Sequence, residues 1–569
     1  MIVYNTDEKE RKEGDILKIL LTAINAKFIH LNPAVYSLKE YASDTGADIA
    51  AVEYTINQTT EQILAGIFEQ HPDVVAFSCY IWNWHTVRLL LQEIPKIMPD
   101  TELWLGGPEV SYDAEKVLET YPQVSGIMIG EGEATFRELC MYWQKDDTNL
   151  VSIAGLYLRE NGYTAYREPM EMDRLPFIYH NLRQFTNRIL YYETSRGCPF
   201  RCSYCLSSIE KDLRFRSLEI VYRELDFFLE NSVKQVKFAD RTFNCNHHHC
   251  YSIWKYLKEH DNGVTNFHFE IAADLLNDEE IELLGEMRPG LVQLEIGVQS
   301  TKAETLSAVR RKTDIGKLTA AVKRIREKGN IHIHLDLIAG LPEESLTDFQ
   351  KSFNDVYRIG CDDLQLGFLK VLKGSYMHER AATYGIRYHD EPPYEILSTH
   401  WLGFGDILEL KRVEHMLETF HNSNQYERML RQMEKEFKEP YQFFRQLAEF
   451  CRREGYEENQ PSREEKFNIL LRFAVAHNPE YDRLYRELLV FDIYSRENCK
   501  RRPTFAADLT AYKAVLHEFT PYRDSHTEPF FYRVWDEDPS YCGPEPVFIT
   551  FDYLHRDPRT NNAAYHVNE

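Results

Sequence analysis

Short apolar runs alternate with segments of helical hydrophobic spacing along the first 150 residues. The apolar runs predict strands at 16–22, 49–54, 74–78, 103–105 and 126–129. The intervening segments predict helices at 35–42, 60–70, 85–94, 114–120 and 134–143, and the third should stop or kink at Pro95. This alternation predicts a parallel, doubly wound, Rossmann-like sheet over 15–150.

A second alternation follows a less regular stretch. Residues 151–187 predict a linker with a small β element, because two short apolar runs flank Glu160-Asn161-Gly162. Over 188–395, strands are expected at 190–194, 235–239, 267–272, 292–298, 331–338 and 363–371. Helices are expected at 218–231, 248–260, 278–287, 301–309 and 315–328. Six such units predict an incomplete parallel barrel.

The remainder of the chain has another character. Residues 396–569 predict a mainly helical domain, with helices at 395–417, 425–453, 464–477 and 479–491. Strands at 530–534 and 547–553 would form a small terminal sheet, and the polar residues 1–14 predict a flexible tail. The fold class expected for the whole chain is therefore α/β with a helical C-terminal domain.

Charge and cysteine usage narrow the functional classes. The net charge of −24 argues against a general nucleic-acid binder, although a local basic pocket stays compatible with it. The start lacks the apolar core of a secretory signal, and no run of 18 apolar residues predicts a membrane span. These features favour the reducing cytoplasm, where clustered cysteines, among the eleven present, indicate metal ligands rather than disulfides.

Three of the cysteines lie close together just past a predicted strand. Cys198, Cys202 and Cys205 can wrap one inorganic cluster with their thiolates. Three protein ligands would leave one iron of a [4Fe–4S] cube open for a small molecule. The spacing leaves two alternatives open, namely a zinc site completed by a distant residue and buried cysteines without a metal.

The cysteine segment, with Tyr204 before the last cysteine, resembles the radical S-adenosylmethionine (SAM) motif. The resemblance implies that SAM binds the fourth iron and that an electron from the cluster cleaves it to a 5′-deoxyadenosyl radical. It also implies a partial (β/α)6 barrel and a position for Tyr204 near the adenine. Further SAM-binding positions follow from family-like strand-end segments: Asp240, Arg241, Glu295, Gln299, Asp336 and Gly340.

Four of these positions also have a structural interpretation that involves no ligand. Asp240 can cap a helix, Glu295 and Gln299 can hydrogen-bond at a strand end, and Gly340 can serve a plain turn. Any one segment is therefore weak evidence. Their order and spacing together favour the radical SAM family.

The N-terminal domain offers its own candidate ligand residues, because doubly wound sheets bind ligands at the carboxyl ends of their strands. Ser78, Tyr80, Trp82 and Asn83 follow the third strand and suit a wide, flat ligand. The domain resembles the cobalamin-binding domain of B12-dependent radical SAM enzymes. The matching pieces are Gly106-Gly107-Pro108-Glu109 and Gly130-Glu131-Gly132-Glu133.

One departure from that resemblance concerns the cobalt ligand. No Asp-x-His-x-x-Gly motif occurs, so no histidine is expected below the cobalt, and neither His30 nor His85 is assigned to it. A structural or regulatory Rossmann-like domain is the alternative. His247-His248-His249 with Cys245 and Cys250 has the composition of a metal site, but its place favours a solvated helix entry. The basic Lys500-Arg501-Arg502 favours a solvated turn over a site for a substrate phosphate or carboxylate.

The combined prediction is a cobalamin-dependent radical SAM enzyme, a methyltransferase acting on an unactivated carbon. Its cofactors would be a [4Fe–4S] cluster, SAM and cobalamin, with no catalytic side chain assigned. The substrate would be a small molecule or modified nucleoside, and the electron donor a flavodoxin or ferredoxin. The alternatives are cyclisation or rearrangement, tRNA-base modification, or an N-terminal domain that binds substrate or a partner without cobalamin.

Overall fold

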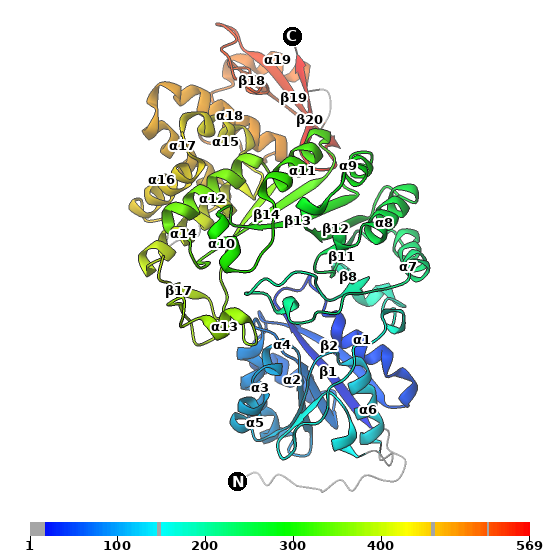
Figure 1. Ribbon diagram of the computed structural model, residues 1–569. Coiled ribbons are helices and arrows are strands. Elements are labelled where there is room, and N and C mark those ends of the chain that lie inside the picture. The colour runs from blue at the N-terminus through cyan, green and yellow to red at the C-terminus, as the bar shows by residue number, and fades with distance from the viewer. Residues whose placement is uncertain (1–16, 145–148, 457–460, 521–522, 569) are drawn as a thin grey trace, which may run out of the picture.

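The computed structural model describes residues 17–144, 149–456, 461–520 and 523–568, so the expected tail over 1–14 lies outside the described residues. The N-terminal domain lies at one end, the barrel sheet in the middle, and the helical region with a terminal sheet at the other end (Figure 1). This arrangement confirms the predicted α/β fold class with a helical C-terminal region.

A seven-stranded sheet in the order β2-β1-β3-β4-β5-β6-β7 forms the N-terminal domain. Its parallel strands are β1 (Lys18–Asn25), β2 (Asp48–Thr55), β3 (Val74–Ser78), β4 (Glu102–Gly106) and β5 (Val124–Met128). One face packs against α2 (Thr60–Phe68), α3 (Trp84–Ile97) and α5 (Ala114–Thr120). The other packs against α1 (Pro33–Tyr41) and α6 (Glu133–Trp143), so both faces are buried, as in a doubly wound sheet.

The small β element expected in the linker belongs to this same sheet. Strands β6 (Leu156–Leu158) and β7 (Gly162–Tyr163) form an antiparallel hairpin, and β6 pairs with β5. The edge of a parallel sheet is thereby covered, which limits unwanted strand pairing.

Helix α3 differs from the expectation at Pro95, since it continues to Ile97. A proline inside a helix leaves the carbonyl four residues earlier without its usual N–H donor. Here the carbonyl of Leu91 accepts a hydrogen bond from the Gln123 side chain at 2.8 Å. This contact replaces the missing donor, a compensation that only the tertiary structure provides.

Six parallel strands in the order β15-β14-β13-β12-β11-β8 form the partial barrel. They are β8 (Leu190–Tyr192), β11 (Gln235–Phe238), β12 (Asn266–Ile271), β13 (Val292–Gln299), β14 (His332–Ala339) and β15 (Asp363–Phe368). The covering helices are α7 (Leu218–Glu230), α8 (His247–Glu259), α9 (Asp278–Gly285), α10 (Ala303–Ala308), α11 (Ile315–Lys328) and α12 (Leu346–Ile359). The last helix was not anticipated from the sequence.

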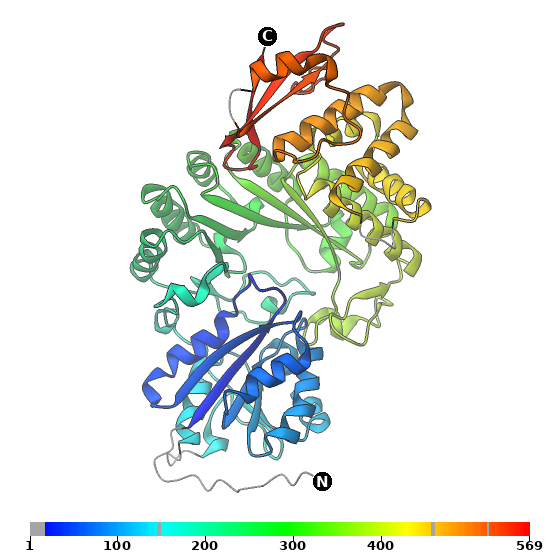
Figure 2. The same cartoon turned by 180° about the vertical axis from the view of Figure 1, so that it is seen from behind.

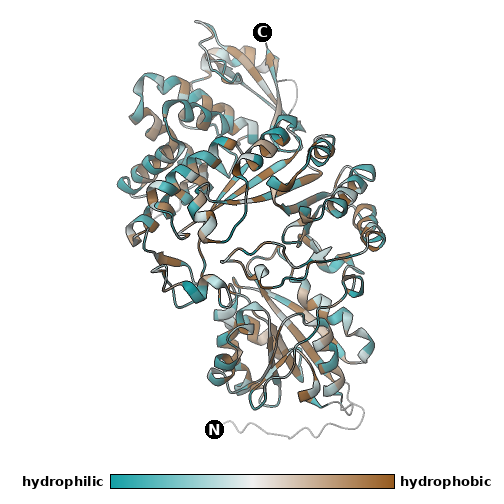
Figure 3. Cartoon of the chain, in the orientation of Figure 1, coloured by the Kyte–Doolittle hydropathy of each residue, from teal (hydrophilic) through white to brown (hydrophobic). Residues whose placement is uncertain are grey.

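The barrel strands are half-buried rather than fully apolar. Along β13 and β14 every second residue is buried against the helices, and the residues between them face the inside of the barrel. Figure 3 shows the strands as brown and teal in turn, under helices whose outer faces are teal. The concave face therefore has room for polar side chains.

The C-terminal region contains α14 (Phe404–Met416), α15 (Glu427–Glu436), α16 (Pro440–Arg453), α17 (Arg463–His477) and α18 (Asp482–Arg496). The helix expected over 395–417 begins later, since Ile396–Ser398 form strand β17, paired with β16 (Arg387–Tyr388). The single helix expected over 425–453 is two helices, because Pro440 has no N–H to donate and starts α16.

The chain ends in a three-stranded antiparallel sheet of β18 (Ser525–Phe530), β19 (Val547–Arg556) and β20 (Ala563–Asn568). The strand expected over 530–534 shares only Phe530 with β18, and the third strand was not expected from the sequence. Seen from behind, this sheet caps the end of the molecule furthest from the N-terminal domain (Figure 2). None of the helices in the described segments combines the length and apolar character needed to cross a membrane.

Candidate functional site

The three-cysteine segment lies on a loop between the barrel and the N-terminal domain. The loop follows β8 and is closed at its base by β9 (Ser195–Arg196) and β10 (Arg214–Phe215), which pair antiparallel. In both views the chain after β8 runs between the two sheets (Figures 1 and 2). Gly197 has φ +91°, and a Cβ there would lie 2.6 Å from the Asp212 carbonyl oxygen, so the tight base requires glycine.

Two side chains contact the cysteine thiols. The Thr242 hydroxyl lies 3.6 Å from Cys198 Sγ, and Arg311 Nη1 donates to Cys202 Sγ at 3.7 Å. In the described part of the chain no three His, Cys, Asp or Glu side chains converge tightly enough to hold a single metal ion. In a [4Fe–4S] cube each thiolate binds a different iron, so such a cluster does not require convergence on one point.

Buried polar atoms without partners surround the same loop. Tyr204 Oη, Gln299 Oε1 and Arg311 Nε are buried and have no hydrogen-bond partner with suitable geometry. Gln299 also has φ +72°, a strained value for a residue with a side chain. A Cβ on Gly297 would lie 2.3 Å from Gln299 Nε2. Unsatisfied donors and acceptors beside three thiols fit a ligand with several polar groups.

Asp240 is used by the chain itself. Its carboxylate accepts hydrogen bonds from Thr194 N at 3.0 Å, Thr194 Oγ1 at 2.6 Å and Ser195 Oγ at 2.5 Å. Burial raises its pKa to about 6, although these bonds lower it. The side chain thus ties the end of β11 to the start of the cysteine loop.

Arg241 and Gly340 occupy different surroundings. Arg241 is exposed, and its charge acts on Tyr80 of the N-terminal domain and on Glu270 of the barrel. Gly340 has φ +92°, and a Cβ there would lie 2.5 Å from Ile396 Cδ1. The glycine therefore permits close packing of the β14 turn against the chain that follows the barrel.

Glu295 belongs to an ion-paired group inside the barrel. Its carboxylate lies 2.8 Å from Lys237 Nζ and 3.0 Å from His268 Nε2. Burial would raise the pKa of Glu295, but the neighbouring His268 and Lys237 outweigh it and lower the pKa to about 2. Glu295 is thus held ionised on the concave face of the sheet.

Two neighbouring carboxyl groups inside the barrel, those of Glu270 and Asp336, have weaker contacts with positive charge. Glu270 is the register partner of Glu295, and its best cation contact is Lys237 at 3.6 Å. Burial and the charge of Glu295 raise the pKa of Glu270 to about 7. Asp336 lies 3.0 Å from His334 Nε2, and burial raises its pKa.

Two aromatic side chains lie just past the carboxyl end of β3, at the edge of the N-terminal sheet where doubly wound folds bind ligands. The rings of Tyr80 and Trp82 stack with centroids 4.3 Å apart, and Trp82 is 42% exposed. Asn83 is fully buried; its amide donates to the carbonyls of Ile24 and Ser78 and accepts from Tyr80 N. Asn83 therefore shapes the loop, whereas the aromatic pair is available to a flat ligand.

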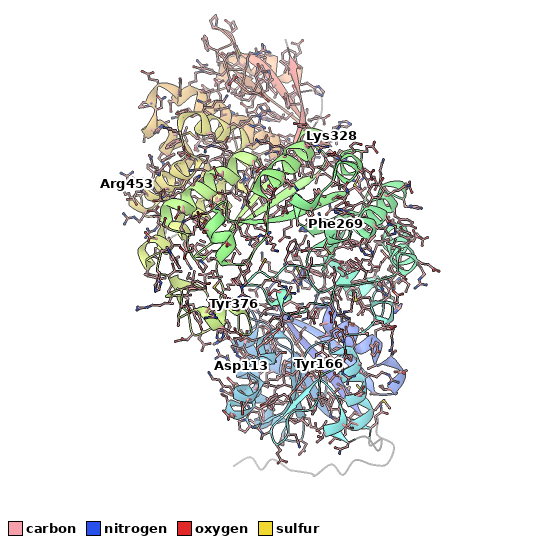
Figure 4. The ribbon with its side chains drawn as sticks, in the orientation of Figure 1. Asp113, Tyr166, Phe269, Lys328, Tyr376 and Arg453 are labelled. Atoms are coloured by element: carbon pink, nitrogen blue, oxygen red, sulfur yellow. The ribbon has the colours of Figure 1, made fainter. Side chains whose placement is uncertain are left out.

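The first glycine loop packs against β3. Gly107 has φ +103°, and a Cβ there would lie 2.6 Å from the Cys79 carbonyl, while Pro108 starts the short helix α4 (Pro108–Ser111). Glu109 is buried, accepts from Tyr394 and lies 3.0 Å from Lys373 Nζ. Lys373 also pairs with Asp113, and Figure 4 shows Asp113 on the side of the domain that faces Tyr376.

The second glycine loop also contacts the barrel. Gly130 has φ +81° with open space around it, and Gly106 and Gly132 have ordinary backbone conformations. Glu131 forms an ion pair with Arg214, and Glu133 accepts from Arg196 Nη2 at 2.7 Å. Three acidic residues singled out as ligand contacts thus carry interdomain ion pairs. Their assignment to a cofactor stays a prediction.

The remaining histidines and basic residues have local partners. His30 Nδ1 lies 2.8 Å from Tyr191 Oη across the domain boundary. In the histidine run, His247 Nδ1 lies 2.9 Å from Glu280 and His249 Nε2 lies 3.1 Å from Thr194 Oγ1, whereas His248 is exposed. Arg502 pairs with Glu528 at 2.6 Å, while Lys500 and Arg501 are exposed.

Four residues of this region were missed from the sequence: Lys237, His268, Glu270 and Arg311. The first three occupy alternate positions of β11 and β12, so a charged residue at every second strand position was an available signal. Arg311 lies after α10, and nothing in the sequence placed it beside Cys202.

Three segments of the chain match known families. Residues 19–140 match the family described as B12 binding domain, and residues 192–356 match the radical SAM superfamily. Residues 382–534 match a family described as protein of unknown function (DUF4080). The radical SAM domain implies a [4Fe–4S] cluster and SAM, and the B12-binding domain implies cobalamin.

Similar individual proteins include several methyltransferases. The chain is 26% identical over 368 residues, 58% of its length, to 2-(S-pantetheinyl)-carbapenam-3-carboxylate methyltransferase of Streptantibioticus cattleyicolor, of which it covers 51%. It is 25% identical over 62% of its length to the cobalamin-dependent radical SAM methyltransferase TokK of Streptomyces tokunonensis, of which it covers 55%. It thus spans about half the length of these two relatives.

The chain is also similar to a cyclase and to a solved methyltransferase structure. The anaerobic magnesium-protoporphyrin IX monomethyl ester cyclase of Rubrivivax gelatinosus is 24% identical over 54% of the chain, which covers 58% of it. The structure of TsrM from Kitasatospora setae, with cobalamin and a [4Fe–4S] cluster bound, aligns with a TM-score of 0.56 and 16% identity, covering 67% of this chain and 79% of that one. The chain thus contains a B12-binding domain, a radical SAM domain and a C-terminal region that matches a family of unknown function.

Proposed function

We propose that this chain is a cobalamin-dependent radical SAM methyltransferase that methylates an unactivated carbon of a small molecule. One observation carries the proposal: the cysteine loop lies between the ligand edge of the B12-binding domain and the open barrel. Contacts on both sides of the boundary support it, namely Glu133 with Arg196 and His30 with Tyr191. The similarity to methyltransferases supports the same reaction class.

The cofactors supply the chemistry, which is a 5′-deoxyadenosyl radical from SAM and the cluster and a methyl group carried by cobalamin. The chain would bind and orient them. Cys198, Cys202 and Cys205 hold the cluster. Gln299 and Arg311 offer the polar end of SAM an unsatisfied carbonyl and an unsatisfied N–H.

The B12-binding domain would hold the corrin at its strand edge. The stacked Tyr80 and Trp82 rings provide a flat apolar surface, and Gly107 and Gly130 keep the neighbouring turns free of side chains. His30 Nδ1 lies 2.8 Å from Tyr191 Oη of the barrel, so this histidine contributes a contact between the two domains.

The concave face of the barrel would receive the substrate. Lys237, His268 and Glu295 form one compensated group there, and Glu270 lies beside it with a pKa of about 7. A carboxyl with that pKa can hold or release a proton near neutral pH. These side chains favour a polar substrate over a hydrocarbon.

A [4Fe–4S] cluster that cleaves SAM needs a low-potential electron donor and a reducing environment. Reduced flavodoxin or ferredoxin would deliver the electron, and a reducing cytoplasm would preserve the cluster.

The test is anaerobic purification with hydroxocobalamin supplied, followed by iron, sulfide and cobalt analysis. About four irons per chain together with stoichiometric corrinoid are expected. Incubation with SAM and a chemical reductant should then release 5′-deoxyadenosine, and deuterated SAM should pass label to the accepted substrate. Iron without corrinoid, or zinc in place of iron, would contradict the proposal.

Radical cyclisation is the second candidate, since the Rubrivivax gelatinosus cyclase is about as similar as the methyltransferases. Product analysis separates the two reactions. A methylated product that carries label from SAM supports methyl transfer, whereas an unlabelled, cyclised product supports the alternative.

A further inference from the structure

The cysteine loop is closed by a short ladder with an unfavourable charge pair. Strands β9 and β10 contribute two residue pairs, Ser195 with Phe215 and Arg196 with Arg214. The two arginines are therefore directly opposite each other, and their side chains are only 15% and 18% exposed. Like charges opposite each other destabilise a ladder, and two pairs provide little stability to offset this.

The compensating charges come from the B12-binding domain. Glu133 Oε1 lies 2.7 Å from Arg196 Nη2, Glu131 Oε2 lies 3.5 Å from Arg196 Nη1, and Glu131 also pairs with Arg214. Within the barrel, Glu193 adds a contact of 3.0 Å to Arg196. The two glutamates of the Gly130-Glu131-Gly132-Glu133 loop thus form ion pairs with both arginines of the ladder.

Contacts other than those with the arginines also hold these two carboxylates in place. Glu133 is the first residue of α6, where the helix N-terminus favours negative charge, and it accepts from Ser37 Oγ at 3.0 Å. Burial would raise the pKa of Glu133, but Arg196 lowers it below the usual range, so the group stays ionised. Glu131 is fixed by Met170 N, which donates to it at 2.9 Å.

We propose that Glu131 and Glu133 are positioning residues that keep the cysteine loop closed, so that cluster retention depends on the B12-binding domain. Arg196 is followed directly by Gly197 and Cys198, so the pairing of β9 with β10 fixes the position of the first cysteine. The inference rests on the proposed function, because it takes the three thiols as cluster ligands.

The test compares iron loss from the full-length chain, purified anaerobically and challenged with a ferrous chelator. The variant E131Q/E133Q keeps the shape of both side chains and removes their charges. Its cluster should be lost about five- to tenfold faster than that of the wild type. The matched control is E138Q, on the same helix, where Glu138 pairs with Arg167 inside the N-terminal domain at 2.6 Å. Its rate should equal that of the wild type.

A rescue variant separates loop positioning from general instability. Adding R214Q to E131Q/E133Q removes the like-charge pair and should restore slow iron loss and the electron paramagnetic resonance signal of the reduced cluster. Corrinoid content should stay at the wild-type value in E138Q.

Several results would overturn the inference. Wild-type retention in E131Q/E133Q would do so, as would fast loss that R214Q does not reverse. A wild-type chain without iron would overturn the proposed function and this inference with it. Iron retained equally by wild type and E131Q/E133Q would overturn the inference alone.

Discussion

The two large parallel sheets of this protein present ligand-binding surfaces in different ways. In the N-terminal sheet, β1 and β3 are buried almost throughout, because helices cover both faces. In the barrel, β13 and β14 alternate between buried residues and residues that face the lumen. A closed sandwich leaves only its edge for a ligand, whereas a partial barrel offers an edge and a concave face.

The difference explains where the charges lie. The N-terminal domain keeps its acidic loop residues at the strand ends, where Glu109, Glu131 and Glu133 pair with cations of the barrel. The barrel keeps Lys237 and Glu295 on the strands themselves. The first arrangement joins two domains. The second lines the concave face of the barrel with charged side chains, and we call this space the polar chamber.

The largest expected effect tests whether the two surfaces bind independently. The C198A/C202A/C205A variant should lose nearly all iron, from about four per chain, because no thiolates remain to hold the cluster. Corrinoid content should be unchanged, since the aromatic edge lies on another sheet. Cys140→Ala, a buried cysteine of α6, is the control. Joint loss of iron and corrinoid would contradict the separation.

The next effect tests the polar chamber. Lys237→Met should destabilise the barrel by about 2 kcal/mol, because Glu295 and Glu270 lose their shared cation in a partly buried site. Hydrogen exchange of the β13 segment measures this loss of protection. Lys234→Met, at an exposed position just before β11, should leave exchange unchanged. Equal exchange in both variants would show that the lumen charges do not stabilise the barrel.

A smaller effect tests the strand edge of the N-terminal sheet. Trp82→Ala removes half of the stacked pair and should weaken hydroxocobalamin binding about tenfold, or 1.4 kcal/mol. Equilibrium dialysis gives the dissociation constant. Tyr166→Ala alters an aromatic side chain that is 65% exposed in the segment following the β7 hairpin, and should not change it. Unchanged affinity for Trp82→Ala would place the corrin elsewhere.

The smallest effect concerns pH, and its sign differs between two neighbouring carboxyls. The raised pKa of Glu270, about 7, costs stability as pH rises from about 4.5 to 7, since the folded chain then holds the proton more tightly than the unfolded chain. Glu270→Gln should flatten this decline by about 1 kcal/mol, after allowance for partial exposure.

Glu295 should behave in the opposite way. Its pKa of about 2 provides stability above about pH 4.5 that is lost as pH falls toward 2. Glu295→Gln should therefore remove the stability that the wild-type barrel gains between about pH 2 and 4.5, which hydrogen exchange measures, and it should also lower the pKa of Glu270. If Glu295→Gln still lost stability between about pH 4.5 and 2 as the wild type does, the assigned direction of the Glu295 pKa would be wrong.

The sequence by itself determined most of the strand–helix order, the partial barrel, the cysteine triad and the resemblance to B12-binding radical SAM proteins. These properties depend on hydrophobic period and on short spacings, which are local in the chain. The strand over 74–78 and the helix over 114–120 were predicted with their observed bounds for that reason.

Only the tertiary structure decided what the charged residues contact. Glu133 and Arg196 are separated by 63 positions, and Tyr394 and Glu109 by 285, so no local pattern could pair them. Asp240 lies at a family-like position, yet its carboxylate accepts from Thr194 and Ser195. A side chain's chemistry follows from its residue type, but its partner depends on which surfaces folding brings together.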